Sequence, residues 1–118
     1  MISTIKNKLP IARKEHKCDL CGETIHKGET YHRQTNVYEG DVYDWIEHLD
    51  CRDVASECGL YWLDECADDG LDMTTFKENV YEIYAALHDE NEAMNLTTNE
   101  QVKWIKENIA KVKEYLRA

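Results

Sequence analysis

Three cysteines and one histidine stand at the spacing of a metal site. Cys18 and Cys21 form a Cys-x2-Cys pair, and after 26 intervening residues His48 and Cys51 form a His-x2-Cys pair. A two-residue gap lets both side chains of a pair reach one ion at about 2.0–2.3 Å, and a tetrahedral zinc ion takes two such pairs. Because the protein fills all four positions, no position is left for water. The pattern predicts one structural zinc ion rather than a catalytic one.

The residues around the two pairs suit metal binding. Gly22 follows the first pair, where a glycine lets the backbone turn sharply and point N–H groups at sulfur. We expect the second pair at the start of a helix, whose N-terminal dipole favours a thiolate. A cysteine turn, a hairpin region and a ligand-bearing helix start together predict a treble clef. Since zinc affinities of about 10–16 kcal/mol exceed what burial supplies in so small a region, residues 15–55 should lose their order without metal.

Other histidines and cysteines leave alternatives open. Three more histidines lie close to the first pair, and one of them could replace His48 as ligand, although His48 has the matching spacing to Cys51. The three are His16, His26 and His32. Cys58 and Cys66 are expected to be small buried residues on helices, and the alternative is a swapped ligand or a redox pair. A thioredoxin-like redox site would need a βαβ pattern, which the sequence lacks.

No catalytic pattern stands out in the rest of the chain. The acidic run of residues 64–72 lacks the register of an EF-hand loop and is expected to be a solvated loop. The sequence has no Ser-His-Asp order, no glycine loop for a phosphate group and no zinc-deaminase signature. We therefore expect that the protein is not an enzyme. The remaining enzymatic alternative is a metal site that lacks one of the four ligands.

Short strands are predicted in the first part of the chain. Residues 1–16 look extended, because Pro10 interrupts any helix. The segment "ETIHKGETYHR" predicts a hairpin in which Ile25 and Tyr31 flank a turn at Gly28. The segment "TNVYEGDVYDW" predicts a second hairpin around its EGD turn, since its alternating Val, Tyr and Trp residues suit a pleated surface.

Helices are predicted in the remainder. Asp50 is the expected N-cap of the first helix. Thr75 and Glu78 form a capping-box pattern ahead of an apolar stripe that ends near residue 88. Thr97 or Thr98 should cap the last helix, whose apolar residues recur at steps of three and four. Those residues are Val102, Ile105, Ile109, Val112 and Leu116.

These elements predict an α+β fold in two parts. Residues 1–58 form a zinc-finger module, a small treble clef of short hairpins and one helix, and residues 59–118 form a helical extension packed on it. A length of 118 residues suits one compact domain. Apolar residues make up 42% of the chain, which suffices for a core. Trp104 stands one step off the last apolar stripe, so it either borders the core or anchors a partner.

The motif resembles a known family over residues 17–52. The stretches "CDLCGETIHKGETYHR" and "WIEHLDC" are similar to the zinc finger of the poly(ADP-ribose) polymerase type. That family's metal ligands correspond here to Cys18, Cys21, His48 and Cys51. Further similar positions are Ile25, Gly28, Arg33 and Trp45. The motif is also similar to fingers of small bacterial and phage proteins. The first resemblance implies bound zinc and recognition of DNA breaks through a basic finger face.

Charge is divided unevenly along the chain, whose formal net charge is −10. Residues 1–34 carry seven Lys/Arg and four Asp/Glu, which gives a net charge of +3. Residues 35–118 carry seven Lys/Arg and twenty Asp/Glu, which gives a net charge of −13. Most of such a surface repels a phosphate backbone. The chain shows no secretory signal and no apolar stretch of about 18 residues, so we expect a cytoplasmic protein without membrane contact.

Two hypotheses about function follow. The first is a zinc-stabilised binding or adaptor protein that acts by protein–protein contact on a basic partner surface. Its specific form is an acidic inhibitor that mimics nucleic acid, related to phage or host defence. The second is direct nucleic-acid binding through the basic N-terminal third. Its contacts would be Lys6, Lys8, Arg13, Lys14, Lys17, Lys27 and Arg33.

Charge near the motif disfavours the second hypothesis. Residues 13–55 hold six Lys/Arg against ten Asp/Glu, net −4, whereas binding to phosphates needs several cations per site. The last helix could also pair with its copy, which would give a homodimer.

Overall fold

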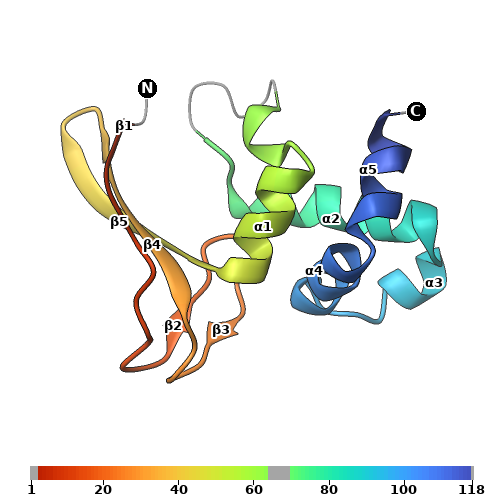
Figure 1. The fold of residues 1–118 in the computed structure, drawn as a ribbon, viewed down its shortest axis with the longest axis horizontal. Helices are drawn as coiled ribbons and strands as arrows, with labels where there is room; N and C mark the ends of the chain where they lie inside the picture. The colour runs from red at the N-terminus through yellow and green to blue at the C-terminus, as the bar shows by residue number, and fades with distance from the viewer. Residues whose placement is uncertain (1–2, 64–69, 118) are drawn as a thin grey trace.

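The chain has strands in its first half and helices in its second half (Figure 1). The structure, a computed structural model, describes residues 3–63 and 70–117. The strands are β1 (Ser3–Lys8), β2 (His16–Lys17), β3 (Thr24–Ile25), β4 (Tyr31–Tyr38) and β5 (Asp41–His48). The helices are α1 (Leu49–Glu57), the 3-10 helix η1 (Leu60–Trp62), α2 (Met73–Leu87), α3 (Glu90–Ala93), α4 (Thr98–Glu107) and α5 (Ile109–Arg117). The predicted α+β class is confirmed.

An antiparallel sheet with the order β1-β4-β5 forms one end of the molecule (Figure 1). Its centre is the second predicted hairpin, in which β4 and β5 pair along their whole length, up to Tyr38 opposite Asp41. The two turn residues, Glu39 and Gly40, have positive φ values of 50° and 88°. A two-residue turn of this kind matches the right-handed twist of the flanking strands. This hairpin is confirmed.

The first predicted hairpin is wrong. Ile25 lies in β3, but β3 pairs with β2, where Ile25 stands opposite His16. Tyr31 lies in β4, whose neighbours are β1 and β5. The cause is the tight turn between β2 and β3, in which the Gly22 N–H donates to the Cys18 carbonyl oxygen at 2.9 Å. That turn sends the chain back along β2, so β3 has a partner before the chain reaches β4.

Two helix starts differ from the prediction. In α1, His48 rather than Asp50 holds the N-cap position. Because β5 runs directly into α1, the end of the strand sets the start of the helix. In α2, the Asp72 carboxylate caps the helix by accepting from the Thr75 N–H at 2.8 Å. Thr75 therefore lies inside the first turn instead of capping it.

The predicted last helix is two helices. Thr97 caps α4 in a capping box with Glu100, as predicted. Asn108 then leaves the helical conformation, at φ −115° and ψ 28°, and separates α4 from α5. The stripe reaches the core only in part, because Leu116 is 42% exposed. Its fully buried members are Val102, Ile105 and Val112.

One hydrophobic core runs through the strand half and the helical half. Helix α1 stands between the sheet and α2–α5 (Figure 1), and α4 packs against both α1 and α2. The core joins Leu20 and Ile25 to Phe76 and Ile105, which are all fully buried. A shared core of this kind is what a helical extension packed on the zinc-finger module requires. The predicted division of the chain into residues 1–58 and 59–118 stays a prediction. Every helix in the described part of the chain is too short or too polar to span a bilayer.

A buried carboxylate organises the inner side of the sheet. Glu47 on β5 is 1% exposed, and its carboxylate lies 2.9 Å from His32 Nδ1 and 2.7 Å from the donor Trp45 Nε1. The Tyr61 hydroxyl also donates to it at 3.0 Å. Burial and the Glu47 charge raise the pKa of Tyr61, so the hydroxyl stays protonated. Since Nε2 of His32 lies 3.0 Å from Asn7 Oδ1, the network joins β1, β4, β5 and η1.

Removal of this carboxylate should destabilise the fold. In Glu47→Ala, the Trp45 and Tyr61 donors lose their buried acceptor, and we expect the free energy of unfolding to fall by about 3–5 kcal/mol. Urea denaturation of the metal-loaded protein measures the change. The matched control is Glu107→Ala, since Glu107 is exposed and should alter that free energy by less than about 0.5 kcal/mol. A similarly small effect for Glu47→Ala would refute the role of the network.

Candidate metal centre

Two short segments bring the four predicted ligands to one point. The turn between β2 and β3 carries Cys18 and Cys21, and the junction of β5 with α1 carries His48 and Cys51. Their sulfur and nitrogen atoms all lie within 4.8 Å of one another. His48 Nδ1 is 3.3 Å from Cys21 Sγ and 3.9 Å from Cys51 Sγ. A tetrahedral ion with bonds of about 2.0–2.3 Å holds its ligand atoms about 3.5–3.8 Å apart. The four residues are positioned to hold one metal ion.

The cluster is shielded from water. The three cysteines are buried, and the His48 side chain is 11% exposed. The backbone N–H groups of Cys21 and His48 donate to Cys18 Sγ, each at 3.4 Å. Gly22 closes the turn at φ +77°, and a Cβ there would lie 3.0 Å from Met73 Sδ. The positive φ is what requires a glycine here, as the sequence indicates, whereas the Met73 side chain could move aside for a Cβ.

His48 and Cys51 are held in their protonated forms while no cation is bound. Hydrogen bonds from the Cys21 and Cys51 thiols hold the pKa of Cys18 far below its usual range. The contacts of Cys51 with Cys18 and Cys21, together with burial, raise the pKa of Cys51. Burial lowers the pKa of His48, but hydrogen bonds and attraction from Cys18 and Cys21 outweigh it and raise that pKa to about 10. A bound ion would displace protons from His48 and Cys51, because metal ligands must be deprotonated.

Two contacts outside the cluster orient its ligands. His48 Nε2 lies 3.0 Å from the Thr24 carbonyl oxygen. Donation of the Nε2 proton to that oxygen leaves Nδ1, which faces the sulfurs, available for a metal. Asp19 joins the cysteine turn to β5: its N–H donates to the Ile46 carbonyl at 2.7 Å, and its carboxylate accepts from the Ile46 N–H at 2.8 Å. Sequence reasoning missed both residues, although the position of Asp19 inside the Cys-x2-Cys pair was an available signal.

The other histidines and cysteines lie elsewhere. His32 and His26 each contact a glutamate carboxylate, and His16 packs on a tyrosine ring. None of these histidines belongs to a ligand cluster within the described ranges. Cys58 is half-buried at the end of α1, and burial raises the pKa of its thiol to about 11. Cys66 and most of the predicted acidic loop fall outside the described residues.

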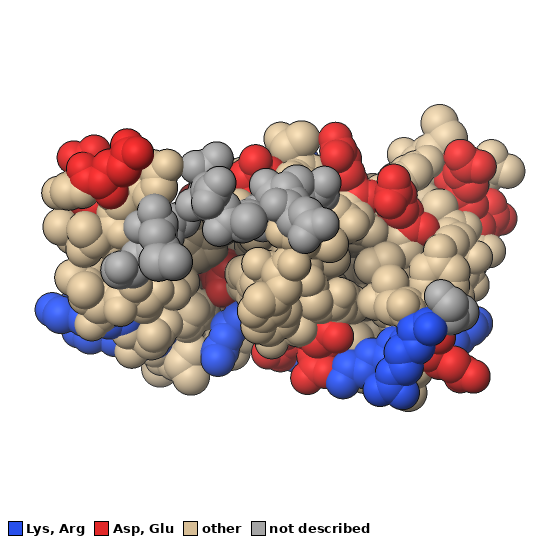
Figure 2. All heavy atoms as spheres, turned by 90° about the horizontal axis from the view of Figure 1, so that it is seen from above, with Lys and Arg blue, Asp and Glu red and all other residues tan. Residues whose placement is uncertain are grey.

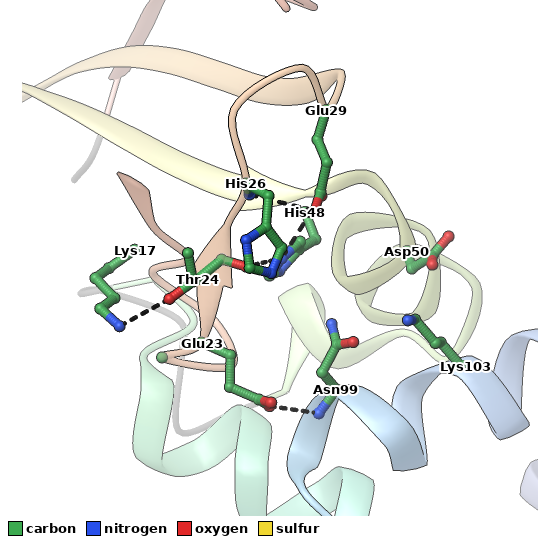
Figure 3. A pocket seen from close by; sticks show the side chains of 10 residues that line it. Lys17, Glu23, Thr24, His26, Glu29, His48, Asp50, Asn99 and Lys103 are labelled. Carbon is green, nitrogen blue, oxygen red and sulfur yellow. Dashed lines mark hydrogen bonds and ion pairs between the residues drawn. The ribbon is translucent and has the colours of Figure 1, made fainter. Parts of the chain in front are cut away.

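A polar hollow of about 580 Å³ lies beside the cluster (Figure 3). The Nε2 edge of His48 meets it next to Thr24, with Glu29 Oε2 4.0 Å from that nitrogen. On the opposite wall, the Asn99 N–H of α4 donates to the Glu23 carboxylate at 2.7 Å. None of the three clustered cysteines lines this hollow. The hollow therefore gives access to the outer edge of the histidine and not to the sulfur atoms.

Comparison with known proteins found no matching family model, no matching curated protein and no matching solved structure. The resemblance to the poly(ADP-ribose) polymerase finger therefore stays a prediction that rests on the motif. The meeting of the four side chains in space is a separate observation, which depends on no relative.

Metal binding should release protons. Near pH 7 the metal-free cluster keeps protons on His48 and Cys51, whose pKa values are raised, and both must leave when a metal binds. His48 and Cys51 alone release about two protons per ion, so we expect at least two in total and an affinity that rises at least roughly 100-fold per pH unit near neutrality. Calorimetric zinc titrations in buffers of different ionisation enthalpy count these protons. Binding that releases none would contradict the protonation states given above.

Proposed function

We propose that the cluster binds one structural zinc ion and that the chain is a binding protein rather than an enzyme. Three thiolates and one imidazole are a donor set of structural zinc sites, whereas Mg²⁺ and Ca²⁺ prefer oxygen ligands. The observation that carries the proposal is that the protein supplies four ligands in one shielded cluster. A site closed in this way has no coordination position for a water molecule that could attack a substrate. The zinc ion would instead fasten the cysteine turn to the start of α1.

Loss of one ligand should remove zinc and local order together. In Cys21→Ser we expect the zinc affinity to fall by more than about 100-fold and residues 15–55 to lose protection from amide hydrogen exchange. Native mass spectrometry counts the metal, and exchange measurements follow the order. Cys58→Ser is the matched control, because Cys58 lies outside the cluster, and it should retain one zinc ion. Undiminished zinc binding by Cys21→Ser would remove the proposed site.

The finer proposal is that the acidic helical half binds a basic surface of a partner protein. The net charge of −10 supports it, and Figure 2 shows acidic side chains at both ends of the molecule. Exposed carboxylates at the end of α2 and along α3 are Glu82, Asp89, Glu90 and Glu92. One specific form is an inhibitor that mimics nucleic acid and occupies a nucleic-acid-binding protein, as in phage or host defence.

A pull-down at two salt concentrations tests this partner class. Proteins held by opposite charge should be basic and should elute between about 0.1 M and 1 M salt, where the screening length falls from about 10 Å to 3 Å. Capture of acidic or neutral proteins alone would refute the proposed partner chemistry.

The second candidate function is direct nucleic-acid binding, and one observation favours it. Five of the seven predicted cations line a single hollow on the sheet. Lys17 lies apart, where its Nζ donates to the Thr24 hydroxyl, and Lys27 lies in an exposed turn. Nucleic acid would therefore meet the sheet rather than the cysteine turn.

A second copy of the chain is a further candidate partner. Helix α5 exposes Tyr115 and Leu116, which a homodimer could cover. Trp104 is half-buried, with its ring edge-on to Tyr84 at 5.1 Å and to His88 at 5.5 Å. It therefore borders the core, and the exposed apolar residues of α5 are the better candidates for a dimer contact. The native mass of the zinc-loaded chain distinguishes monomer from dimer.

A further inference from the structure

A basic hollow of about 660 Å³ lies on the outer side of the sheet, between β1, β4 and the loop that joins β1 to β2. Five cations line it, against one carboxylate, that of Asp44. The cations are Lys6, Lys8, Arg13, Lys14 and Arg33. In the view of Figure 2 the Lys and Arg side chains lie along the lower edge of the molecule, at the sheet end and also at the helical end. The hollow thus concentrates positive charge in a chain of net charge −10.

The strand pairing places these side chains on one face. Lys6 and Lys8 are two residues apart on β1, so the pleat points both to the same side of the sheet. Lys6 stands opposite Thr35 of β4, and Lys8 stands opposite Arg33. Thr35 in turn stands opposite Asp44 of β5. The intervening residues of β4 and β5 point to the other side, where the buried carboxylate network lies.

Most of these cations have no acidic partner. Arg33 donates from Nε to Asp44 at 3.0 Å, and this contact holds the pKa of Asp44 below its usual range. The side chains of Lys8, Arg13 and Lys14 make no hydrogen bond or ion pair with any residue in 3–63 or 70–117. Like charges around one hollow repel each other. A bound anion would remove that repulsion.

Rings and apolar groups border the cations. The half-buried His16 ring lies over Tyr31, with centroids 5.2 Å apart and planes tilted by 40°. Ile11 is 65% exposed and lines the same hollow next to Pro10. A positive groove for the backbone, combined with rings and apolar groups for the bases, is typical of single-strand binding sites.

We propose that this hollow binds the sugar–phosphate backbone of a single-stranded nucleic acid, with bases against His16 and Ile11. A flexible strand can enter the hollow and meet cations from β1, β4 and the loop. The His16 ring and the exposed Ile11 beside the cations favour unpaired bases over a duplex or a lipid surface. This inference rests on the proposed function as a zinc-stabilised binding protein, and it names a ligand and a surface separate from the metal cluster.

Binding at this site should depend steeply on salt. Contacts of Lys6, Lys8, Arg13 and Lys14 with phosphates predict a slope of about −3 in log affinity against log salt concentration for a single strand. Each lost contact should weaken binding roughly 5-fold at ~100 mM salt, so three lost contacts should weaken it on the order of 100-fold.

Fluorescence anisotropy with the zinc-loaded full chain and a labelled oligothymidine of about 15 nucleotides tests the proposal. The hollow variant combines Lys8→Ser, Arg13→Ser and Lys14→Ser. The control combines Lys77→Ser, Lys103→Ser and Lys111→Ser, which change the net charge equally at exposed positions outside the hollow. We expect the control to bind like the unmodified chain and the hollow variant to bind on the order of 100-fold more weakly.

Several outcomes would overturn the proposal. They are no binding by the unmodified chain at ~50 mM salt, equal weakening in both variants, or preferential binding to duplex DNA, anionic vesicles or a poly-glutamate peptide. Zinc content and folding are measured in the same samples. If the folded, zinc-loaded chain does not bind the oligothymidine, only this inference is refuted. If the chain folds without zinc, the proposed function is refuted.

Discussion

The fold depends on the joining of residues 18–21 to residues 48–51, two segments that 26 residues separate in the sequence. Paired hydrogen bonds between Asp19 and Ile46 align them, and the ligand atoms of the cluster meet at their junction. Strands β2 and β3 have only two residues each, too few to be stable by pairing alone. A metal ion that joins both segments would hold this part of the chain together and fix where α1 begins.

The surfaces available for binding lie away from that junction. The outer side of the sheet carries unpaired cations, and the far end of the helical half carries exposed carboxylates. Helix α1 stands between the two regions (Figure 1), so neither neutralises the other by direct contact. Under the proposals made above, these two surfaces of opposite charge would each take a ligand of the other charge. In that view zinc provides rigidity, and the charges provide recognition.

Features that depend on neighbours in the sequence were predictable, and features that depend on distant pairing were not. The metal ligands, the EGD hairpin and the Thr97 cap follow from local spacing. The partner of β3 could not be predicted in this way, because the tight cysteine turn pairs β3 with β2 instead of with the strand that follows it. The basic hollow could not be predicted either, because it depends on the pairing register of β1 with β4, which places Lys8 opposite Arg33. The orientation of His48 depends on the Thr24 backbone carbonyl. Every residue has such a carbonyl, so the amino-acid sequence could not indicate this contact.

The central claim is that one zinc ion is bound by three sulfurs and one imidazole nitrogen. X-ray absorption at the zinc edge of the purified chain tests it most directly. The account predicts three sulfur neighbours at about 2.3 Å and one nitrogen neighbour at about 2.0–2.1 Å. A zinc ion with an oxygen neighbour in place of one of these ligands would contradict the closed site. A folded chain that contains no zinc would contradict the metal's role altogether.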